Sequence, residues 1–291
     1  MEEISGRGIE RVMTFREALN VGTYILEKAK IENADGDAWT LLAHVCGIDR
    51  TFYLMHQMDS LTEEQKTQYR IVLVKRIEHV PLQYITGEAG FMGLIFKVNS
   101  SVLIPRYDTE ILVERVLKHT NSGMKVLDMC TGSGCIAISI KHLCPDTEVT
   151  AVDISRSALL LAKENGREND TKIEWIQSNL FEKVRGRFHI IASNPPYIPT
   201  EVIETLDDEV KIYEPFQALD GMEDGLYFYR EIITQAGNYL ERNGMLFFEI
   251  GAEQGEAVSQ LMTEAGFADV CVEKDLAGLD RVVYGVYSGE P

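Results

Sequence analysis

Residues 126–137 read VLDMCTGSGCIA, an apolar run that enters a glycine-rich turn and continues into a second apolar segment. Glycine allows a backbone to pass close to a ligand, and the first turn of a helix offers N–H groups that have no partner within the helix. The stretch therefore predicts a strand, a ligand-binding turn and a helix in succession.

The same order repeats along the rest of the chain. Candidate strands lie at 124–129, 148–153, 172–177, 188–193, 244–250, 268–273 and 281–287, and candidate helices at 107–119, 134–144, 155–167, 226–240 and 253–265. Repeated strand–helix alternation predicts an α/β fold, in which helices cover both faces of a twisted, mostly parallel sheet. No helix separates the last two strands, so we expect one strand to be antiparallel to the rest.

The segment before this alternation is helical in pattern. Apolar residues recur at helical spacing after Thr14, which is a suitable N-cap residue. Asp35 or Asp37 is the expected cap of a second helix, and Ser60 with Glu63 has the spacing of a capping box for a third.

Residues 90–98, GFMGLIFKV, are rich in β-forming side chains and are punctuated by glycine, which predicts a hairpin. We therefore divide the chain into an extension at 1–12 that we expect to be disordered, a small helical bundle at 13–85, a β-hairpin linker at 86–104 and an α/β domain at 105–291.

The composition excludes several classes of protein. With 28 basic and 46 acidic side chains the net charge is −18, which disfavours broad binding to nucleic acid or to anionic membranes. No apolar run is long enough to span a bilayer, and the opening MEEISG does not resemble a signal peptide. The five cysteines contain no Cys-x-x-Cys pair and the six histidines form no cluster, so we expect a cytoplasmic protein without a metal site.

An acidic residue follows the glycine-rich turn at the place where a nucleoside cofactor would need it. Asp153 ends the predicted strand 148–153, and a carboxylate there can accept hydrogen bonds from ribose hydroxyls. The alternative is that the glycines only form a tight turn and that Asp153 only caps the next helix. From the turn alone, a dinucleotide such as NAD stays possible.

A second loop follows the predicted strand 188–193 and reads NPPY at residues 194–197. The side-chain oxygen of Asn194 and the carbonyl of Pro195 can each accept one N–H of a planar amino or amide group. Pro195 and Pro196 stiffen the loop, and Tyr197 offers an aromatic face. The alternative is a simple turn after a strand, but this tetrapeptide in this place is rare by chance.

With these motifs the chain resembles the class I S-adenosylmethionine-dependent methyltransferases, and more closely the HemK/PrmC family of release factor glutamine methyltransferases. The resemblance covers nearly the whole chain from Met13. Its motifs, besides residues 194–197, are PLQYITG (81–87), FMGL (91–94), IPRYDTE (104–110), EP (214–215), ALDG (218–221), EDGL (223–226) and DLAGLDR (275–281). The resemblance implies a Rossmann-like methyltransferase sheet and transfer of methyl from S-adenosyl-L-methionine to the side-chain amide nitrogen of a protein glutamine.

The resemblance also implies a role for individual residues. The methionine part of the cofactor would lie on the turn formed by Cys130, Thr131, Gly132, Ser133 and Gly134. Asp153 would hold the ribose, and the adenine would lie by Asn179 with Leu180 or Phe181 packed on the ring. Asn194, beside the cofactor, would hold the target glutamine amide together with Pro195, Pro196 and Tyr197, and we expect Asn194, Pro195 and Tyr197 to be catalytic. Cys130 and Tyr107 depart from the family pattern, which has glycine and proline there.

The implied substrate is the Gly-Gly-Gln glutamine of class 1 peptide chain release factors, with residues 13–85 as the docking domain of a monomeric enzyme. The alternatives are a ribosomal protein glutamine, an adenine or guanine amino group, and a non-catalytic nucleotide-binding protein. Of the other polar residues, His189 is expected to be structural and residues 207–209 to be a solvated loop, whereas Arg106, Glu110 and Glu249 are left open between a site role and a structural one.

Overall fold

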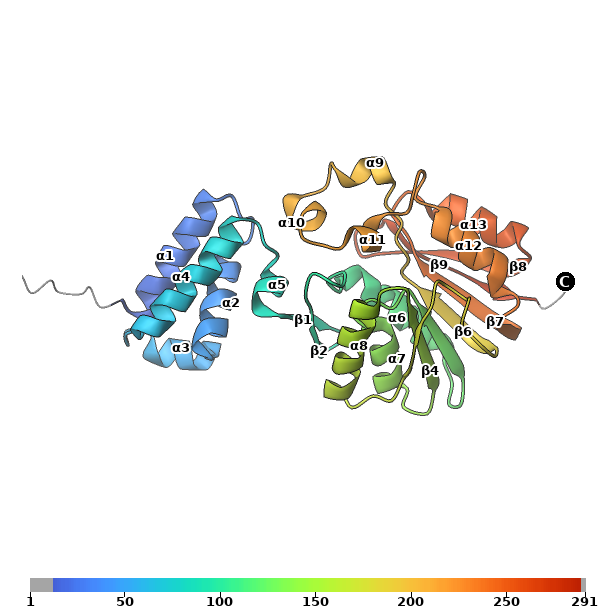
Figure 1. Ribbon diagram of the computed structural model, residues 1–291, viewed down its shortest axis with the longest axis horizontal. Coiled ribbons are helices and arrows are strands. Elements are labelled where there is room, and N and C mark those ends of the chain that lie inside the picture. The colour runs from blue at the N-terminus through green and yellow to red at the C-terminus, as the bar shows by residue number, and fades with distance from the viewer. Residues whose placement is uncertain (1–12, 289–291) are drawn as a thin grey trace, which may run out of the picture. The chain divides into compact units, whose positions relative to one another are not determined.

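The computed structural model describes residues 13–288, so the predicted extension at 1–12 lies outside the described residues. The chain divides into two compact units, of which the first ends at Thr86 and the second begins at Gly87. Figure 1 shows a helical first unit and an α/β second unit.

Helices alone form the described part of the first unit: α1 (Phe15–Lys28), α2 (Ala34–Cys46), α3 (Arg50–His56), α4 (Glu63–Ile77) and α5 (Leu82–Thr86). Their apolar faces meet in one core, whose buried members include Phe15, Ala18, Leu26, Leu41, Leu42, Tyr69 and Leu73. The predicted helical bundle is confirmed, although the sequence pattern did not indicate the short helix α3.

Of the N-caps predicted for three helices of the first unit, only that of α1 is the predicted residue. Thr14 caps α1 and forms a capping box, as expected. Helix α4 begins later than predicted, because its capping box is formed by Thr62 and Gln65 and not by Ser60 and Glu63. Both pairs have the same spacing, so the sequence pattern could not distinguish them.

Helix α2 begins after Asn33, so the prediction of an Asp35 or Asp37 cap is wrong. Both aspartates lie in the first turn, where a negative charge suits the helix dipole. The Asp37 side chain turns into the core instead, and its Oδ2 accepts a hydrogen bond from Nε of Arg76 at 2.7 Å. The two side chains are each 7% exposed, so they form a buried ion pair between α2 and α4.

The second unit is built on a seven-stranded sheet in the order β5-β4-β3-β6-β7-β9-β8. The strands are β3 (Lys125–Met129), β4 (Glu148–Asp153), β5 (Glu174–Gln177), β6 (Phe188–Ser193), β7 (Leu240–Glu249), β8 (Phe267–Lys274) and β9 (Asp280–Tyr287). Strand β9 runs antiparallel to both of its neighbours, and the other pairs are parallel. The predicted mostly parallel sheet with one antiparallel strand is confirmed.

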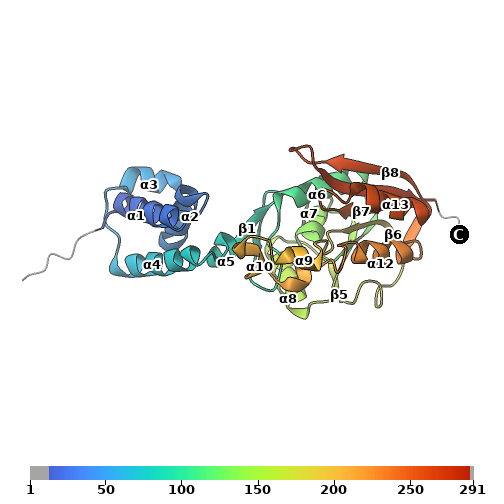
Figure 2. The same cartoon turned by 90° about the horizontal axis from the view of Figure 1, so that it is seen from above.

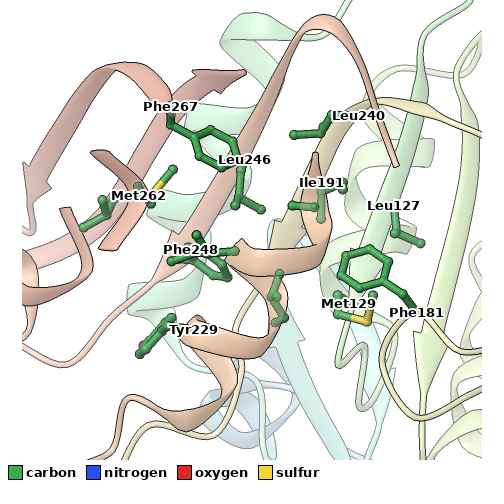
Figure 3. Close-up of a cluster of buried hydrophobic side chains, with 14 of the residues drawn as sticks. Leu127, Met129, Phe181, Ile191, Tyr229, Leu240, Leu246, Phe248, Met262 and Phe267 are labelled. Atoms are coloured by element: carbon green, nitrogen blue, oxygen red, sulfur yellow. The ribbon is translucent and has the colours of Figure 1, made fainter. Parts of the chain in front are cut away.

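Helices cover both faces of this sheet (Figures 1 and 2). One face carries α6 (Tyr107–His119), α7 (Cys135–Leu143) and α8 (Arg156–Glu168), and the other carries α12 (Tyr227–Ala236) and α13 (Gly255–Glu264). Figure 3 shows the core on the second face, where Tyr229 and Phe248 are buried side by side in an edge-to-face contact. This packing fixes the carboxyl ends of the parallel strands, where ligands bind in such sheets.

The hairpin of β1 (Glu88–Phe91) and β2 (Leu94–Lys97) belongs to the second unit. Phe91 and Phe96 are buried in the core beneath α6, and the Met92 N–H at the hairpin turn donates to the Glu110 carboxylate at 2.6 Å. Glu110 therefore holds the hairpin.

Three short helices lie between β6 and α12: α9 (Thr200–Ile203), α10 (Asp208–Lys211) and α11 (Phe216–Leu219). We call residues 198–226 the crossover segment. The segment expected to be a solvated loop begins α10, and Asp207 and Asp208 are exposed there. Among the helices of residues 13–288, none combines the length and the apolar character that a bilayer crossing needs.

Candidate active site

A cavity of about 630 Å³ opens at the carboxyl ends of β3, β4 and β6. Its size is that of a typical cofactor or small-ligand site. Its wall includes Cys130, Thr131, Gly132, Ser133, Asp153, Ser178, Asn179, Leu180, Asn194 and Pro196, together with part of the crossover segment. One cavity thus brings together the glycine-rich turn, the acidic end of β4 and the NPPY loop.

The glycine-rich turn after β3 needs a left-handed backbone at three places. The φ angles are +64° at Cys130, +55° at Gly132 and +83° at Gly134. Glycine adopts this conformation freely, whereas a residue with a Cβ is strained in it. The departure from the family pattern at Cys130 therefore places a strained residue where glycine would be relaxed. Burial raises the pKa of the Cys130 thiol, so it is neutral at physiological pH.

Asp128, the residue of β3 two before the turn, holds the turn from behind. It is fully buried, and its Oδ2 accepts hydrogen bonds from the Thr131 hydroxyl at 2.5 Å and from the Ala137 N–H at 3.2 Å. Burial raises the pKa of this carboxyl to about 7. We predicted no role for Asp128 from the sequence, although a carboxylate inside an apolar strand is itself a signal.

Asp153 does more than cap the next helix. Its Oδ2 accepts from the Gly132 N–H and its Oδ1 from the Ser155 N–H, both at 2.8 Å. Each oxygen keeps a second lone pair for a ligand hydroxyl. Burial raises the pKa of Asp153, and the backbone N–H groups lower it again. The carboxylate therefore links the turn after β3 to the end of β4.

The loop after β5 supplies Ser178, Asn179 and Leu180 to the cavity wall. The amide nitrogen of Asn179 donates to Oε1 of Glu182 at 3.0 Å, so its oxygen is turned away from that partner. Phe181 is buried in the core and its ring stacks on Tyr239 with 4.4 Å between centroids. Of the two residues expected to pack on an adenine, Leu180 lies in the cavity wall and Phe181 lies behind it.

The NPPY loop is held on both sides. Asn194 donates from Nδ2 to the Thr109 hydroxyl of α6 at 3.2 Å, and the Tyr197 carbonyl accepts from Nε2 of Gln254 at 3.0 Å. Gly225 in the crossover segment has a φ of +73°, and a Cβ there would lie 2.3 Å from the Tyr197 carbonyl oxygen. Only glycine fits that approach, which accounts for a glycine in the EDGL motif.

Asn194 and Pro196 line the cavity, whereas Pro195 is buried next to them and Tyr197 packs partly against the core. Burial raises the pKa of the Tyr197 phenol, so the ring is neutral at physiological pH.

Arg106 also lines the cavity, and it forms an ion pair with Glu214 of the crossover segment. Arg281 of β9 contacts Asp275 at 3.1 Å and Asp108 at 3.4 Å. The IPRYDTE, EP and DLAGLDR motifs, which are far apart in the sequence, therefore meet at this edge of the sheet.

His189 plays the structural part expected of it, because its Nδ1 accepts the backbone N–H of Lys125 at 3.0 Å. In the part of the chain that the structure describes, no group of three or more His, Cys, Asp or Glu side chains is placed to hold a metal ion.

The mostly parallel sheet with one antiparallel strand, the cavity at its carboxyl edge and the glycine-rich turn are those of a class I methyltransferase. Two family models match the chain, namely "PrmC N-terminal domain" over residues 17–87 and "Methyltransferase small domain" over residues 106–210. A release factor glutamine methyltransferase of Clostridium botulinum is 42% identical over 93% of this chain and 98% of its own length. A release factor glutamine methyltransferase of Geobacter sulfurreducens is 39% identical over 94% of this chain and 97% of its own length. The chain belongs to the family of release factor glutamine methyltransferases.

Solved structures agree on the fold. A methyltransferase from Pyrococcus furiosus matches with a TM-score of 0.53 and 18% identity, over 77% of this chain and 99% of its own. A Thermus thermophilus 16S rRNA N2 G1207 methyltransferase, in complex with AdoMet and guanosine, matches with a TM-score of 0.50 and 16% identity, over 69% of this chain and 49% of its own. At these identities the likeness concerns the fold alone.

Proposed function

We propose that the cavity binds S-adenosyl-L-methionine and that Asn194 and Pro195 present the glutamine amide of a class 1 release factor to its methyl group. The observation that carries the proposal is that a single cavity is lined by the glycine-rich turn, Asp153 and Asn194. A donor and an acceptor of a methyl group have to meet in one place, and here the elements suited to each are adjacent.

The residues present suit the cofactor. Residues 130–133 of the turn line the cavity, and, apart from its two chain neighbours, no atom of residues 13–288 lies within 4 Å of where a Cβ on Gly132 would stand. Asp153 retains lone pairs for two ribose hydroxyls, and Leu180 gives an apolar surface for the adenine. When bound, S-adenosyl-L-methionine supplies an electrophilic methyl group on a sulfonium.

The protein's task is to make an amide nitrogen nucleophilic. This nitrogen normally shares its lone pair with its carbonyl group. The Asn194 side-chain oxygen and the Pro195 carbonyl each accept one of its N–H bonds, which favours the positive charge that develops on nitrogen as it bonds to the methyl carbon. Acceptors aimed in this way contribute about 3–4 kcal/mol each. One N–H proton then leaves to water, because the nitrogen becomes acidic only after it has attacked.

Recognition of the whole release factor requires surface beyond the cavity, because one glutamine side chain carries almost no identity. We assign this role to the first unit. Leu54, Met55 and Met58 are 67%, 70% and 68% exposed there. Exposed methionines adapt to a protein partner. With a net charge of −18, we expect no direct contact with nucleic acid, and we propose a monomeric, cytoplasmic enzyme.

Incubation with labelled S-adenosyl-L-methionine and a class 1 release factor tests the function. We expect label on the Gly-Gly-Gln glutamine, whereas label on a ribosomal protein or on RNA, or none at all, would contradict the proposal.

Paired Leu54→Ser and Met55→Ser substitutions test the docking surface and should raise KM for the intact factor but not for a short Gly-Gly-Gln peptide. Leu160→Ser is the matched control, because Leu160 is 60% exposed on α8 of the second unit. An unchanged KM in the double variant would contradict the docking role.

A further inference from the structure

A buried carboxylate lies behind the NPPY loop. Glu249, the last residue of β7, is 1% exposed, and its Oε2 has no hydrogen-bond partner within residues 13–288. The Thr109 hydroxyl and the Asn194 amide both face this carboxylate, and both favour its charged form. Thr109 itself is 2% exposed, on the first turn of α6. A carboxylate is costly to bury, and a hydrophobic residue would pack in its place without that cost.

Simple chemistry fixes how Thr109 and Asn194 orient beside this carboxylate. An ionised carboxylate only accepts, so the single hydroxyl proton of Thr109 points to Glu249. The lone pairs of that hydroxyl are then left for Asn194, whose Nδ2 donates to it at 3.2 Å. The N–H2 end of the Asn194 amide is therefore held against α6 and β7, and its oxygen is turned the other way.

We propose that Thr109 and Glu249 are positioning residues, which hold the Asn194 amide so that its oxygen, and not its nitrogen, meets the substrate glutamine. This inference rests on the proposed role of Asn194 and deepens it. An amide rotated by half a turn would set N–H2 against the N–H2 of the glutamine, donor against donor. The chain Asn194 to Thr109 to Glu249 allows only the useful orientation while Glu249 is ionised.

The charge of Glu249 is set by several neighbours. Burial, and to a lesser extent Asp108 of α6, raise its pKa, whereas Thr109, Arg281 of β9 and Asn194 lower it, and the net pKa is about 7. Tyr197 in the NPPY loop, Tyr229 of α12 and Cys135 of α7 also face this charge, and all three are neutral at physiological pH because their own pKa values are raised.

When Glu249 takes up a proton it becomes a donor to Thr109, and the Thr109 hydroxyl can then turn its own proton toward Asn194. The amide loses its fixed direction, so methyl transfer should slow as the pH falls through about 7. Asp128 titrates in the same range. It contacts Thr131 and Ala137 rather than Asn194, so variants separate the two groups.

The test compares isosteric pairs in the full-length enzyme. Thr109→Val removes the hydroxyl and should lower kcat about 10- to 100-fold, by analogy with the loss of residues that orient metal ligands. Thr109→Ser keeps the hydroxyl and should restore most of the rate. Glu249→Gln should lower kcat in the same way, with KM for the release factor and calorimetric affinity for S-adenosyl-L-methionine close to wild type.

The pH profile gives the sharper readout. The fall in kcat on acidification through about 7 should vanish in Glu249→Gln and should persist in Asp128→Asn. A wild-type kcat in Thr109→Val, equal losses in the Thr109 Val and Ser variants, or an unchanged profile in Glu249→Gln would overturn the inference. Its failure is distinct from failure of the proposed function, which would show as an inactive wild type or a fully active Asn194→Ala.

Discussion

Replacing Asp153 with asparagine should weaken cofactor binding through two effects at once. The Gly132 and Ser155 N–H groups each donate to a different oxygen of this carboxylate at 2.8 Å. Asparagine keeps one oxygen and brings an N–H2 group in place of the other, so one backbone N–H would face a donor. The same change removes an acceptor from the ribose hydroxyls.

The magnitude follows from the bonds lost. A hydrogen bond to a buried charged group contributes about 1.5–3 kcal/mol, and part of the ribose contribution is lost in addition. We expect a loss of about 2–4 kcal/mol in binding free energy, which is about a 30- to 1000-fold weaker affinity. Because Ser155 also caps α8 through its own side chain, the fold should survive.

Isothermal titration calorimetry with S-adenosyl-L-methionine and with S-adenosylhomocysteine measures this affinity. Asp269→Asn is the matched control, because Asp269 is exposed on β8 and the substitution there should leave the affinity unchanged. A folded Asp153→Asn variant that binds the cofactor as tightly as wild type would show that this carboxylate does not hold the ribose.

Further variants test the role of Asn194, docking by the first unit, the buried ion pair and the titration of Glu249. Asn194→Ala should cut kcat about 10²- to 10³-fold with little change in cofactor affinity, and a wild-type rate of methylation would contradict the hydrogen-bonding mechanism. A chain that begins at Gly87, once shown to fold and to bind cofactor, should lose efficiency on intact release factor far more than on a Gly-Gly-Gln peptide, and equal losses would reject docking by the first unit. Asp37→Ala should destabilise the first unit by about 3–5 kcal/mol in urea denaturation, because it removes the carboxylate that pairs with the buried Arg76 guanidinium; an unchanged midpoint would count against that ion pair. The raised pKa of Glu249, about 7 against an ordinary 4.5, means that the folded state holds this proton more tightly than the unfolded state, so stability falls as pH rises through that window. Glu249→Gln should therefore gain up to about 3 kcal/mol over wild type at pH 8 and little at acid pH, and denaturation curves with the same pH dependence for both proteins would show that the carboxylate does not titrate there.

Much of the second unit could be predicted from local pattern. The predicted bounds of β4, β6 and α6 are those of the structure, because in each an unbroken periodic run ends at a clear polar or glycine residue. The antiparallel strand β9 was also predictable, since a connection too short for a helix cannot return a strand to the parallel direction.

The features that local sequence pattern could not predict depend on tertiary contacts. The capping-box spacing occurs at both Ser60 and Thr62, and only packing selects Thr62 as the cap. Asp37 resembles a helix cap locally and becomes half of a buried ion pair because α4 brings Arg76 to it.

In the candidate active site, too, local pattern predicted some residues, and tertiary contacts determine the others. The residues expected to bind cofactor and substrate mostly line one cavity, because parallel strands bring their carboxyl ends to one edge. The partners of Asn194 come from elements that no local pattern connects with it, namely Thr109 on α6 and Glu249 at the end of β7. The place of Glu249 at the carboxyl end of a predicted strand left it open between a site role and a structural one, and only the folded structure shows that it faces Asn194.

We propose above all that the enzyme transfers a methyl group to a release factor glutamine that Asn194 holds. Mass spectrometry of a class 1 release factor, after incubation with S-adenosyl-L-methionine and either wild-type enzyme or Asn194→Ala, tests it most directly. We predict one added methyl group on the amide nitrogen of the Gly-Gly-Gln glutamine with the wild type and almost none with the variant. A methyl group on another residue would contradict the proposed substrate, and equal methylation by both proteins would contradict the proposed role of Asn194.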